Sequence, residues 1–278
     1  MTTAATHQRS TRERRHYAHS PLLGGVEMLA AEYKQHAFPR HAQESVVIGL
    51  VEEGTIDFSG GGEDVSIEEG DVLFISPGTV HEAFGHADSP WTYRALYLTP
   101  QQWEAACLTM GAPMPGGAAV LRAPHLYQRL RGVHRHLIGG TLPERLLEDT
   151  VRAVVDSVVQ HAGTARSANP RAVDAPLARV RRVLDEQLTR RVPLGEMAAL
   201  AGLSRFHFLR AFSRAYGVSP YAYSLNRRLL EAQRQLSHGA AISMTALEFG
   251  FADQAHLTRH FLRTIGVTPG EYQRAFAS

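Results

Sequence analysis

The feature that most limits what this chain folds into is an internal repeat in its C-terminal third. Residues 208–220 align with residues 257–269 at an offset of 49, and upstream of them the offset becomes 48. The equivalent positions include Leu194 and Ile242, Gly202 and Gly250, Arg210 and Arg259, Phe212 and Phe261, Gly217 and Gly266, and Tyr223 and Tyr272. A repeat of this kind predicts two copies of one supersecondary unit.

Each copy has the pattern of a helix-turn-helix. In the first copy Gly202 allows the positive φ of a tight turn, Ser204 caps the following helix, and Gly217 ends it. We expect recognition helices at about 204–216 and 253–265, whose outer faces meet DNA. The residues expected on those faces are Arg205, Phe206, Leu209, Arg210 and Ser213 in the first helix, and Gln254, Ala255, Thr258 and Arg259 in the second.

The segment between the copies predicts how far apart the two recognition helices lie. A helix that begins at Ser219 and Pro220 and runs to about Ser237 has 18 residues, so it is roughly 27 Å long. Recognition helices with that separation would enter successive major grooves, which are about 34 Å apart on one side of B-DNA. The alternative is a plain helical bundle whose arginines are only solvated.

The charge of the chain is divided unevenly between its two halves. Residues 176–278 contain 14 arginines and seven acidic residues, a net charge of +7, whereas residues 1–175 carry a net charge of −5. This division suggests that only the C-terminal half meets a polyanion, with chance variation in surface charge as the alternative. Arg210 suits a guanine edge, whereas Leu209 and Ala255 suit apolar contact, for example with thymine methyl groups.

Residues 163–175 lack apolar periodicity and predict a linker between two domains. Before the linker, residues 33–98 contain short apolar or alternating runs separated by glycine turns, which is typical of a small antiparallel barrel or sandwich. We expect a flexible arm at 1–20, a barrel domain at 21–162 and a DNA-binding domain at 176–278. Within the barrel domain, helices are expected at about 100–110 and 143–161.

The expected helix at 143–161 carries a strongly apolar stripe. Leu147, Val151, Val154, Val155 and Val158 recur at helical spacing along it. A stripe more apolar than a solvent-facing helix requires predicts a homodimer formed through this helix. The alternative is that the stripe packs on the barrel of its own chain.

Four segments resemble the signature of the AraC/XylS family of transcription regulators, namely PLGEMAALAGLS, FLRAFSRAYGVSP, ALEFGFADQAHLTRHF and GVTPGEY. Thr245 departs from that signature, because the family usually has an apolar residue there. The resemblance implies an α+β chain, with an N-terminal antiparallel cupin-like β-barrel and flanking helices. It also implies a C-terminal all-α domain of two helix-turn-helix units joined by a long helix, in a sequence-specific regulator controlled by a small organic effector.

The N-terminal half resembles the family's effector domain through residues 38–44 and 70–81. The resemblance implies that His41 and His81 orient the effector, and that Arg40 pairs with its carboxylate if the effector is an acid. The effector-binding residues expected on this basis are Tyr33, Phe38, Arg40, His41, Val47, Phe74 and His81. The alternative is a barrel filled by its own side chains, with regulation by dimerisation or by a protein partner.

A cupin metalloenzyme fused to a DNA-binding module is the alternative function. Such a site needs about three imidazole or carboxylate ligands, and the sequence has only His41 and His81 in place. We therefore expect no catalytic residue, no metal and no cofactor. The lone cysteine, Cys107, also excludes an intrachain disulfide.

The chain has no apolar run long enough to cross a bilayer and no secretory signal, which predicts a cytoplasmic protein that does not bind membranes. The expected partners are double-stranded DNA, a small-molecule effector and a second copy of the chain. RNA polymerase joins them if the protein is an activator. The sequence does not name the effector or the promoter, and it does not distinguish activation from repression.

Overall fold

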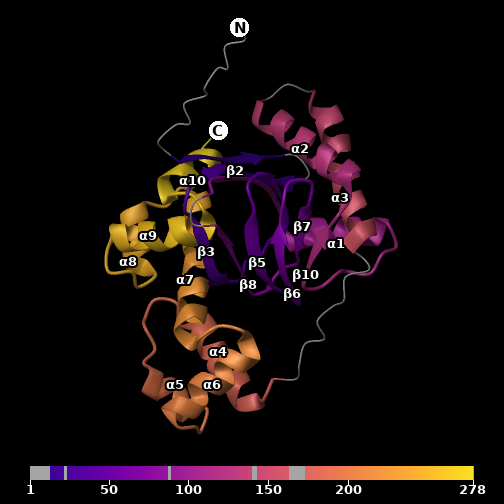
Figure 1. The fold of residues 1–278 in the computed structure, drawn as a ribbon. Helices are drawn as coiled ribbons and strands as arrows, with labels where there is room; N and C mark the ends of the chain where they lie inside the picture. The colour runs from indigo at the N-terminus through magenta and orange to yellow at the C-terminus, as the bar shows by residue number, and fades with distance from the viewer. Residues whose placement is uncertain (1–12, 22–23, 87–88, 140–142, 163–172, 278) are drawn as a thin grey trace.

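The computed structural model describes residues 13–21, 24–86, 89–139, 143–162 and 173–277. In this part of the chain two antiparallel sheets build the N-terminal domain (Figure 1). The six-stranded sheet has the order β1-β2-β9-β4-β7-β10, and the four-stranded sheet has the order β3-β8-β5-β6. The strands are β1 (Arg14–Ser20), β2 (Val26–Tyr33), β3 (Ala37–His41), β4 (Val46–Glu53), β5 (Ile56–Gly60), β6 (Glu63–Ile67), β7 (Val72–Ile75), β8 (His81–Gly85), β9 (Trp91–Leu98) and β10 (Ala118–Leu121). The predicted antiparallel barrel domain and α+β class are confirmed.

The tightest turn of the four-stranded sheet follows directly from the sequence. Gly60 pairs with Glu63, so only Gly61 and Gly62 connect β5 to β6. Both connecting residues have positive φ, 61° and 99°. A two-residue hairpin turn needs this conformation, and glycine adopts it without strain.

Three helices pack on the outer face of the six-stranded sheet: α1 (Pro100–Thr109), α2 (Pro124–Gly139) and α3 (Glu144–Ala162). α1 begins where the sequence predicts, because the Thr99 hydroxyl accepts a hydrogen bond from the backbone N–H of Gln102 at 3.2 Å. The apolar stripe of α3 is buried against α1, α2 and the six-stranded sheet. The chain therefore covers the stripe itself, and the stripe no longer argues for a second copy.

Phe74 lies on the opposite face of the sheet from the one we expected. Val72 and Phe74 of β7 point toward α1, where the Phe74 and Trp103 ring centroids are 5.1 Å apart, whereas Leu73 and Ile75 point inward. Successive side chains of a strand alternate between faces, so an error of one residue in phase moves Phe74 out of the barrel interior.

Part of the segment predicted as a flexible arm, residues 1–20, is an ordered strand. Residues 1–12 lie outside the described residues, but Arg14–Ser20 forms β1 and pairs with β2 from Arg14↔Glu32 to Ser20↔Val26. Tyr17 is buried in this strand and donates a hydrogen bond from its hydroxyl to Glu27 at 2.6 Å. Most of the predicted linker, residues 163–172, also lies outside the described residues.

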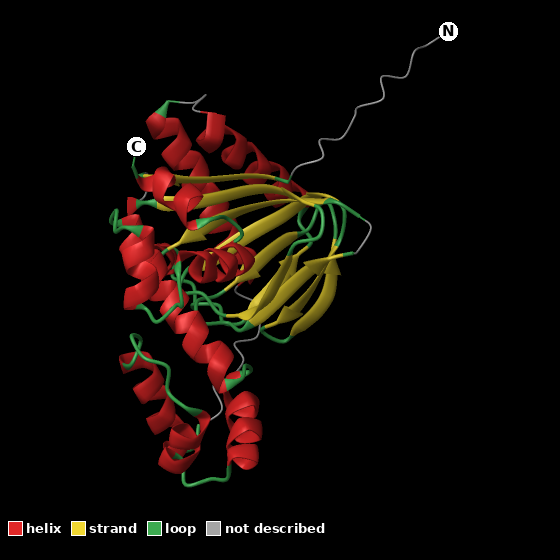
Figure 2. Cartoon of the chain, turned by 90° about the vertical axis from the view of Figure 1, so that its left-hand side faces the viewer, coloured by secondary structure: helices red, strands yellow, loops and turns green. Residues whose placement is uncertain are grey.

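The helical domain has two units that differ in how they are supported. Its helices are α4 (Ala175–Glu186), α5 (Leu194–Leu200), α6 (Arg205–Tyr216), α7 (Pro220–Ser237), α8 (Ile242–Glu248), α9 (Gln254–Ile265) and α10 (Pro269–Phe276). The first unit has its own apolar core, which includes Leu184, Phe208 and Phe212. The second unit shares a core with the inner faces of the two sheets. Figures 1 and 2 accordingly show α8–α10 against the β-domain and α4–α6 at one end of the molecule.

The position of Phe74 predicts a stability effect. Phe74→Ala should lower the free energy of unfolding by about 3–5 kcal/mol, because it empties a fully buried site beside Trp103. Phe84→Ala is the matched control, since Phe84 of β8 is 45% exposed and should change stability by only about 0.5 kcal/mol. Urea denaturation of both variants measures the difference, and equal losses would contradict the assigned phase of β7.

Candidate functional site

The first recognition helix, α6, has the caps that the sequence predicts. The Ser204 side chain accepts a hydrogen bond from the backbone N–H of His207 at 3.3 Å, and Gly217 ends the helix with φ 74°. Phe208 and Phe212 are fully buried, which fixes the face that points inward. The opposite face carries exposed Arg205, Phe206 and Arg210 and partly exposed Leu209 and Ser213.

The second recognition helix, α9, repeats this design. The Asp253 side chain accepts from the backbone N–H of His256 at 2.6 Å, and Gly266 ends the helix with φ 90°. Leu257 and Phe261 are fully buried. Gln254, Ala255 and Arg259 are exposed and Thr258 is partly exposed, so all nine predicted DNA-facing residues are open to solvent.

The C-terminal ends of both recognition helices are hydrogen-bonded to the β-domain. Arg40 of β3 donates from Nε to the Gly217 carbonyl oxygen at 2.7 Å, and its NH1 lies 2.9 Å from Glu82. Tyr33 of β2 donates from its hydroxyl to the Gly266 carbonyl oxygen at 2.9 Å. These two predicted effector residues therefore hold the DNA-binding domain in place.

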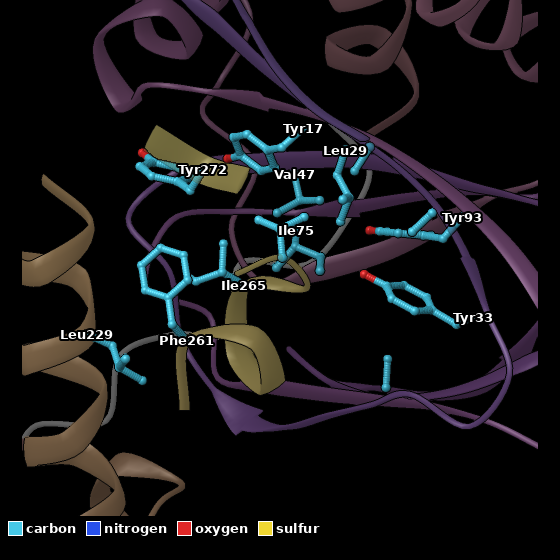
Figure 3. Packing of buried hydrophobic residues seen from close by; sticks show 14 of the residues in the cluster. Tyr17, Leu29, Tyr33, Val47, Ile75, Tyr93, Leu229, Phe261, Ile265 and Tyr272 are labelled. Carbon is cyan, nitrogen blue, oxygen red and sulfur yellow. The ribbon is translucent and has the colours of Figure 1, made fainter. Parts of the chain in front are cut away.

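A cavity of about 670 Å³ lies where the barrel interior meets the helical domain. From the sheets it is lined by side chains that include Phe38, His41, Phe58, His81 and Tyr93, and from the helices by Leu230, Gln233, Ile265 and Tyr272. Beside the cavity, Tyr272, Phe261 and Ile265 of the helical domain belong to the same buried cluster as Tyr17, Val47 and Ile75 of the β-domain (Figure 3). The volume and the mostly apolar walls suit a small organic molecule.

The structure brings together only some of the expected effector residues. Phe38, His41 and His81 line the cavity. Val47 faces the same interior within the apolar core but does not reach the cavity, Phe74 lies on the outer face, and Tyr33 and Arg40 bind helix ends.

Sequence reasoning missed the cavity residues on β1, β2, β5 and β9, and every residue that the helical domain contributes. Tyr17, Glu27, Phe58, Tyr93 and Tyr97 are the clearest examples. The tyrosine that occurs at equivalent positions of the repeat, Tyr223 and Tyr272, could have indicated one of these residues. A buried tyrosine hydroxyl usually has a hydrogen-bond partner, so a partner for each tyrosine could have been expected. In the structure Tyr272 donates to Glu27 at 3.2 Å.

The two cavity histidines are uncharged hydrogen-bond acceptors. Nδ1 of His41 lies 2.7 Å from the Pro39 carbonyl oxygen and Nδ1 of His81 lies 2.8 Å from the Thr79 carbonyl oxygen. A carbonyl oxygen only accepts, so each Nδ1 carries the proton and each Nε2 is bare. Burial lowers the pKa of His41 to about 4, and burial together with the neighbouring His41 lowers the pKa of His81 to about 3.

Glu27 is the buried carboxyl group of the cavity wall. Burial raises its pKa, while the hydrogen bonds from Tyr17 and Tyr272 act in the opposite direction. The Tyr17 hydroxyl is on β1 and the Tyr272 hydroxyl is on α10, so this carboxyl group joins the β-domain to the second helix-turn-helix unit.

Within the described residues, no cluster of three or more His, Cys, Asp or Glu side chains could hold a metal ion. Within the same residues, no helix is both long and apolar enough to span a membrane.

Comparison with known proteins gives matches over both halves of the chain. The AraC-like ligand binding domain matches residues 23–153, and a helix-turn-helix domain matches residues 197–275. The chain is 28% identical over 225 residues to an uncharacterized HTH-type transcriptional regulator of Bacillus subtilis, YbfI, with 79% of this chain and 81% of the relative covered. It is 22% identical over 263 residues to the thermoregulatory protein LcrF of Yersinia pestis, with 90% and 96% covered.

A solved structure shares the fold of nearly the whole chain. Unsaturated fatty acid bound ToxT from Vibrio cholerae superposes with a TM-score of 0.56 at 12% identity, covering 89% of this chain and 94% of that chain.

The buried histidines predict a loss of stability in acid. His41, His81 and His134 keep a pKa of about 3 to 4 in the folded chain, whereas an unfolded histidine takes up a proton below about pH 6.5. The unfolded state therefore binds more protons in this window, so the Tm should fall as the pH is lowered from about 6.5 to about 4. His41→Asn and His81→Asn should each flatten this fall, which thermal denaturation across the pH range measures. The exposed His125→Asn is the control variant, and a flattening as large in that variant would contradict the assignment.

Proposed function

Because the chain belongs to the AraC family of transcription regulators, we propose that a small organic effector controls its DNA binding from the cavity between the barrel and the helical domain. The observation that carries this proposal is the origin of the cavity walls, which come from both domains. A molecule bound there contacts the β-domain and the second helix-turn-helix unit together.

Such a molecule can change DNA binding only through a difference in affinity between two arrangements of the domains. The arrangement described here closes the cavity with residues of α7, α9 and α10, including Leu230, Ile265 and Tyr272. An effector that fills the cavity gains contacts in this arrangement and loses the helical ones when the second unit moves away. It therefore stabilises the docked unit. The ToxT structure with a bound unsaturated fatty acid supports an effector site in a protein of this fold.

On DNA, we propose that α6 is the main base-reading helix and that α9 reads fewer bases. Arg210 is exposed, with its guanidinium carbon 5.5 Å from the centroid of the Phe206 ring, so the arginine and the ring form one projecting surface. On α9 the exposed Arg259 lies beside Ala255, which has no hydrogen-bonding side chain, so this helix offers fewer donors to base edges than α6 does. The 18-residue helix α7 separates the two units by roughly 27 Å along its axis, which suits successive major grooves.

Two partner predictions remain proposals. We expect two copies of the chain to bind a regulatory site, although the stripe on α3 no longer supports an interface through that helix. We also expect contact with RNA polymerase if the protein activates transcription. Sedimentation of the protein at tens of micromolar, alone and on DNA, tests the first.

Effector binding should depend on both walls of the cavity. A thermal-shift screen first identifies a molecule that stabilises the full chain. Phe38→Leu on β3 and Leu230→Ala on α7 should then each weaken its binding about five- to tenfold, because each removes about 1 kcal/mol of apolar contact. Phe84→Ala, exposed on β8, is the control. Weakening by the barrel variant alone would show that the effector does not bridge the domains.

Arginine variants test the DNA-reading roles. Preferred duplexes are first selected from a random pool with the full chain. Arg210→Ala should then cost about 1–3 kcal/mol of binding free energy on the selected site and relax its sequence preference. Arg259→Ala should cost less, and the affinity of the parent protein should fall steeply with salt. Arg152→Ala, exposed on α3, is the control. A larger loss for Arg259→Ala than for Arg210→Ala would reverse the assignment.

A further inference from the structure

Two buried histidines of the cavity wall carry hydrogen-bond acceptors. His41 and His81 are 6% and 4% exposed, and their ring centroids lie 4.4 Å apart. Each Nδ1 is committed to a backbone carbonyl oxygen of its own chain segment. Neither Nε2 has a hydrogen-bond partner in the described part of the protein, so two neighbouring bare nitrogen atoms remain for a molecule in the cavity.

Two tyrosines on strand β9 of the six-stranded sheet add hydroxyl groups to the same cavity. Tyr93 and Tyr97 both line the cavity, and among the described residues neither hydroxyl has a hydrogen-bond partner. Such hydroxyls serve as donors or acceptors, so they complement a bound hydroxyl group of either orientation. Phe38 and Phe58 supply flat apolar surface beside the histidines.

Positive charge is found only at the edge of the described cavity lining. The charged residues that line it are Glu27, Glu44 and Arg234. Arg234 is 62% exposed and forms an ion pair with Glu231, while Glu44 pairs with Arg227 at 2.6 Å. Arg40, the residue that sequence analysis assigned to an acidic effector, already binds Glu82 and the Gly217 carbonyl oxygen.

From these observations we propose that the effector is an uncharged ring molecule with two adjacent hydroxyl groups, bound by the Nε2 atoms of His41 and His81. This inference rests on the proposed effector function of the cavity. Each hydroxyl donates to one imidazole, and the ring lies against the aromatic wall. A carboxylate in the same place would bring its negative charge against two nitrogen lone pairs and toward Glu27, and Arg40, the cation near His81, is already paired with Glu82 and the Gly217 carbonyl oxygen.

Matched small probes test this ligand class by calorimetry on the full chain. The diols are catechol and cis-cyclohexane-1,2-diol, the blocked analogue is 1,2-dimethoxybenzene, and the acids are benzoate and cyclohexanecarboxylate. We expect a diol to bind with a Kd of about 1 mM, as fits a ligand of about eight heavy atoms. The blocked analogue and the acids should bind at least about tenfold more weakly, because a lost buried hydrogen bond costs about 1–1.5 kcal/mol.

His81→Asn is the sharpest variant for this test. The asparagine amide nitrogen takes the place of Nδ1 and keeps a donor for the Thr79 carbonyl oxygen, while the Nε2 acceptor is removed. Diol binding should fall about tenfold in this variant. His125→Asn, exposed on α2, is the matched control.

Several outcomes overturn the proposed ligand class. The first is that the acids bind more tightly than the diols and that Arg234→Ala abolishes this binding of the acids. The second is that 1,2-dimethoxybenzene binds as tightly as catechol. The third is that no diol binds at about 10 mM, a concentration well above the expected Kd. Stoichiometric binding of zinc chloride that His81→Asn abolishes would instead make the two imidazoles metal ligands.

Measuring DNA affinity with the same probes separates this inference from the proposed function. Diols that bind without changing DNA affinity would keep the ligand class and contradict effector control. Acids that bind and change DNA affinity would support effector control and contradict the proposed ligand class.

Discussion

The structure depends on one apolar core that two domains share. The inner faces of both sheets and the second helix-turn-helix unit bury a single cluster, in which Phe261 and Tyr272 pack with the barrel interior (Figure 3). Burial of apolar surface is the dominant favourable term in such packing. Because α7, α9 and α10 supply one wall of the cavity, its present shape depends on the docked position of the second unit. The shape of the candidate ligand cavity and the position of α9 are thus consequences of the same packing.

The repeat shows how one sequence unit is adapted to two surroundings. Tyr223 of α7 donates to Asp185 of α4 at 2.8 Å, which ties the first unit together from within. Its equivalent, Tyr272, donates instead to Glu27 of the barrel at 3.2 Å. The first unit keeps a core of its own around Phe208, whereas the second borrows the β-domain as part of its core. The copies are therefore alike in the caps of α6 and α9 and different in the contacts that hold each unit in place.

Local patterns were enough to predict the two recognition helices, the helix between them and the helices at about 100–110 and 143–161, but not α2 or α4. Ser204 and Gly217 act where the sequence placed them, because capping depends on residues within one turn of the helix end. The cavity was less accessible to such reasoning. Phe74 was assigned to the wrong face because a short, continuously buried strand such as β7 carries no alternation that fixes its phase.

Contacts between residues distant in sequence explain the other differences from expectation. Tyr33 was expected to touch an effector, yet its partner is a carbonyl 233 residues away. Arg40 likewise binds a carbonyl 177 residues away. Apolar periodicity reports which side of an element is buried but not which element covers it. The helical wall of the cavity was unpredictable for that reason.

The two contacts with the recognition helices differ in strength, and this difference indicates which unit an effector moves. The Arg40 side chain is 43% exposed, so water competes with its bond to the end of α6 and the net stabilisation is small. Tyr33 is 1% exposed, and breaking its bond to the end of α9 leaves a buried carbonyl without a donor. The docked position of α9 is also the one that the shared core holds. We therefore expect a cavity ligand to act mainly on the second unit, because the first unit has a core of its own.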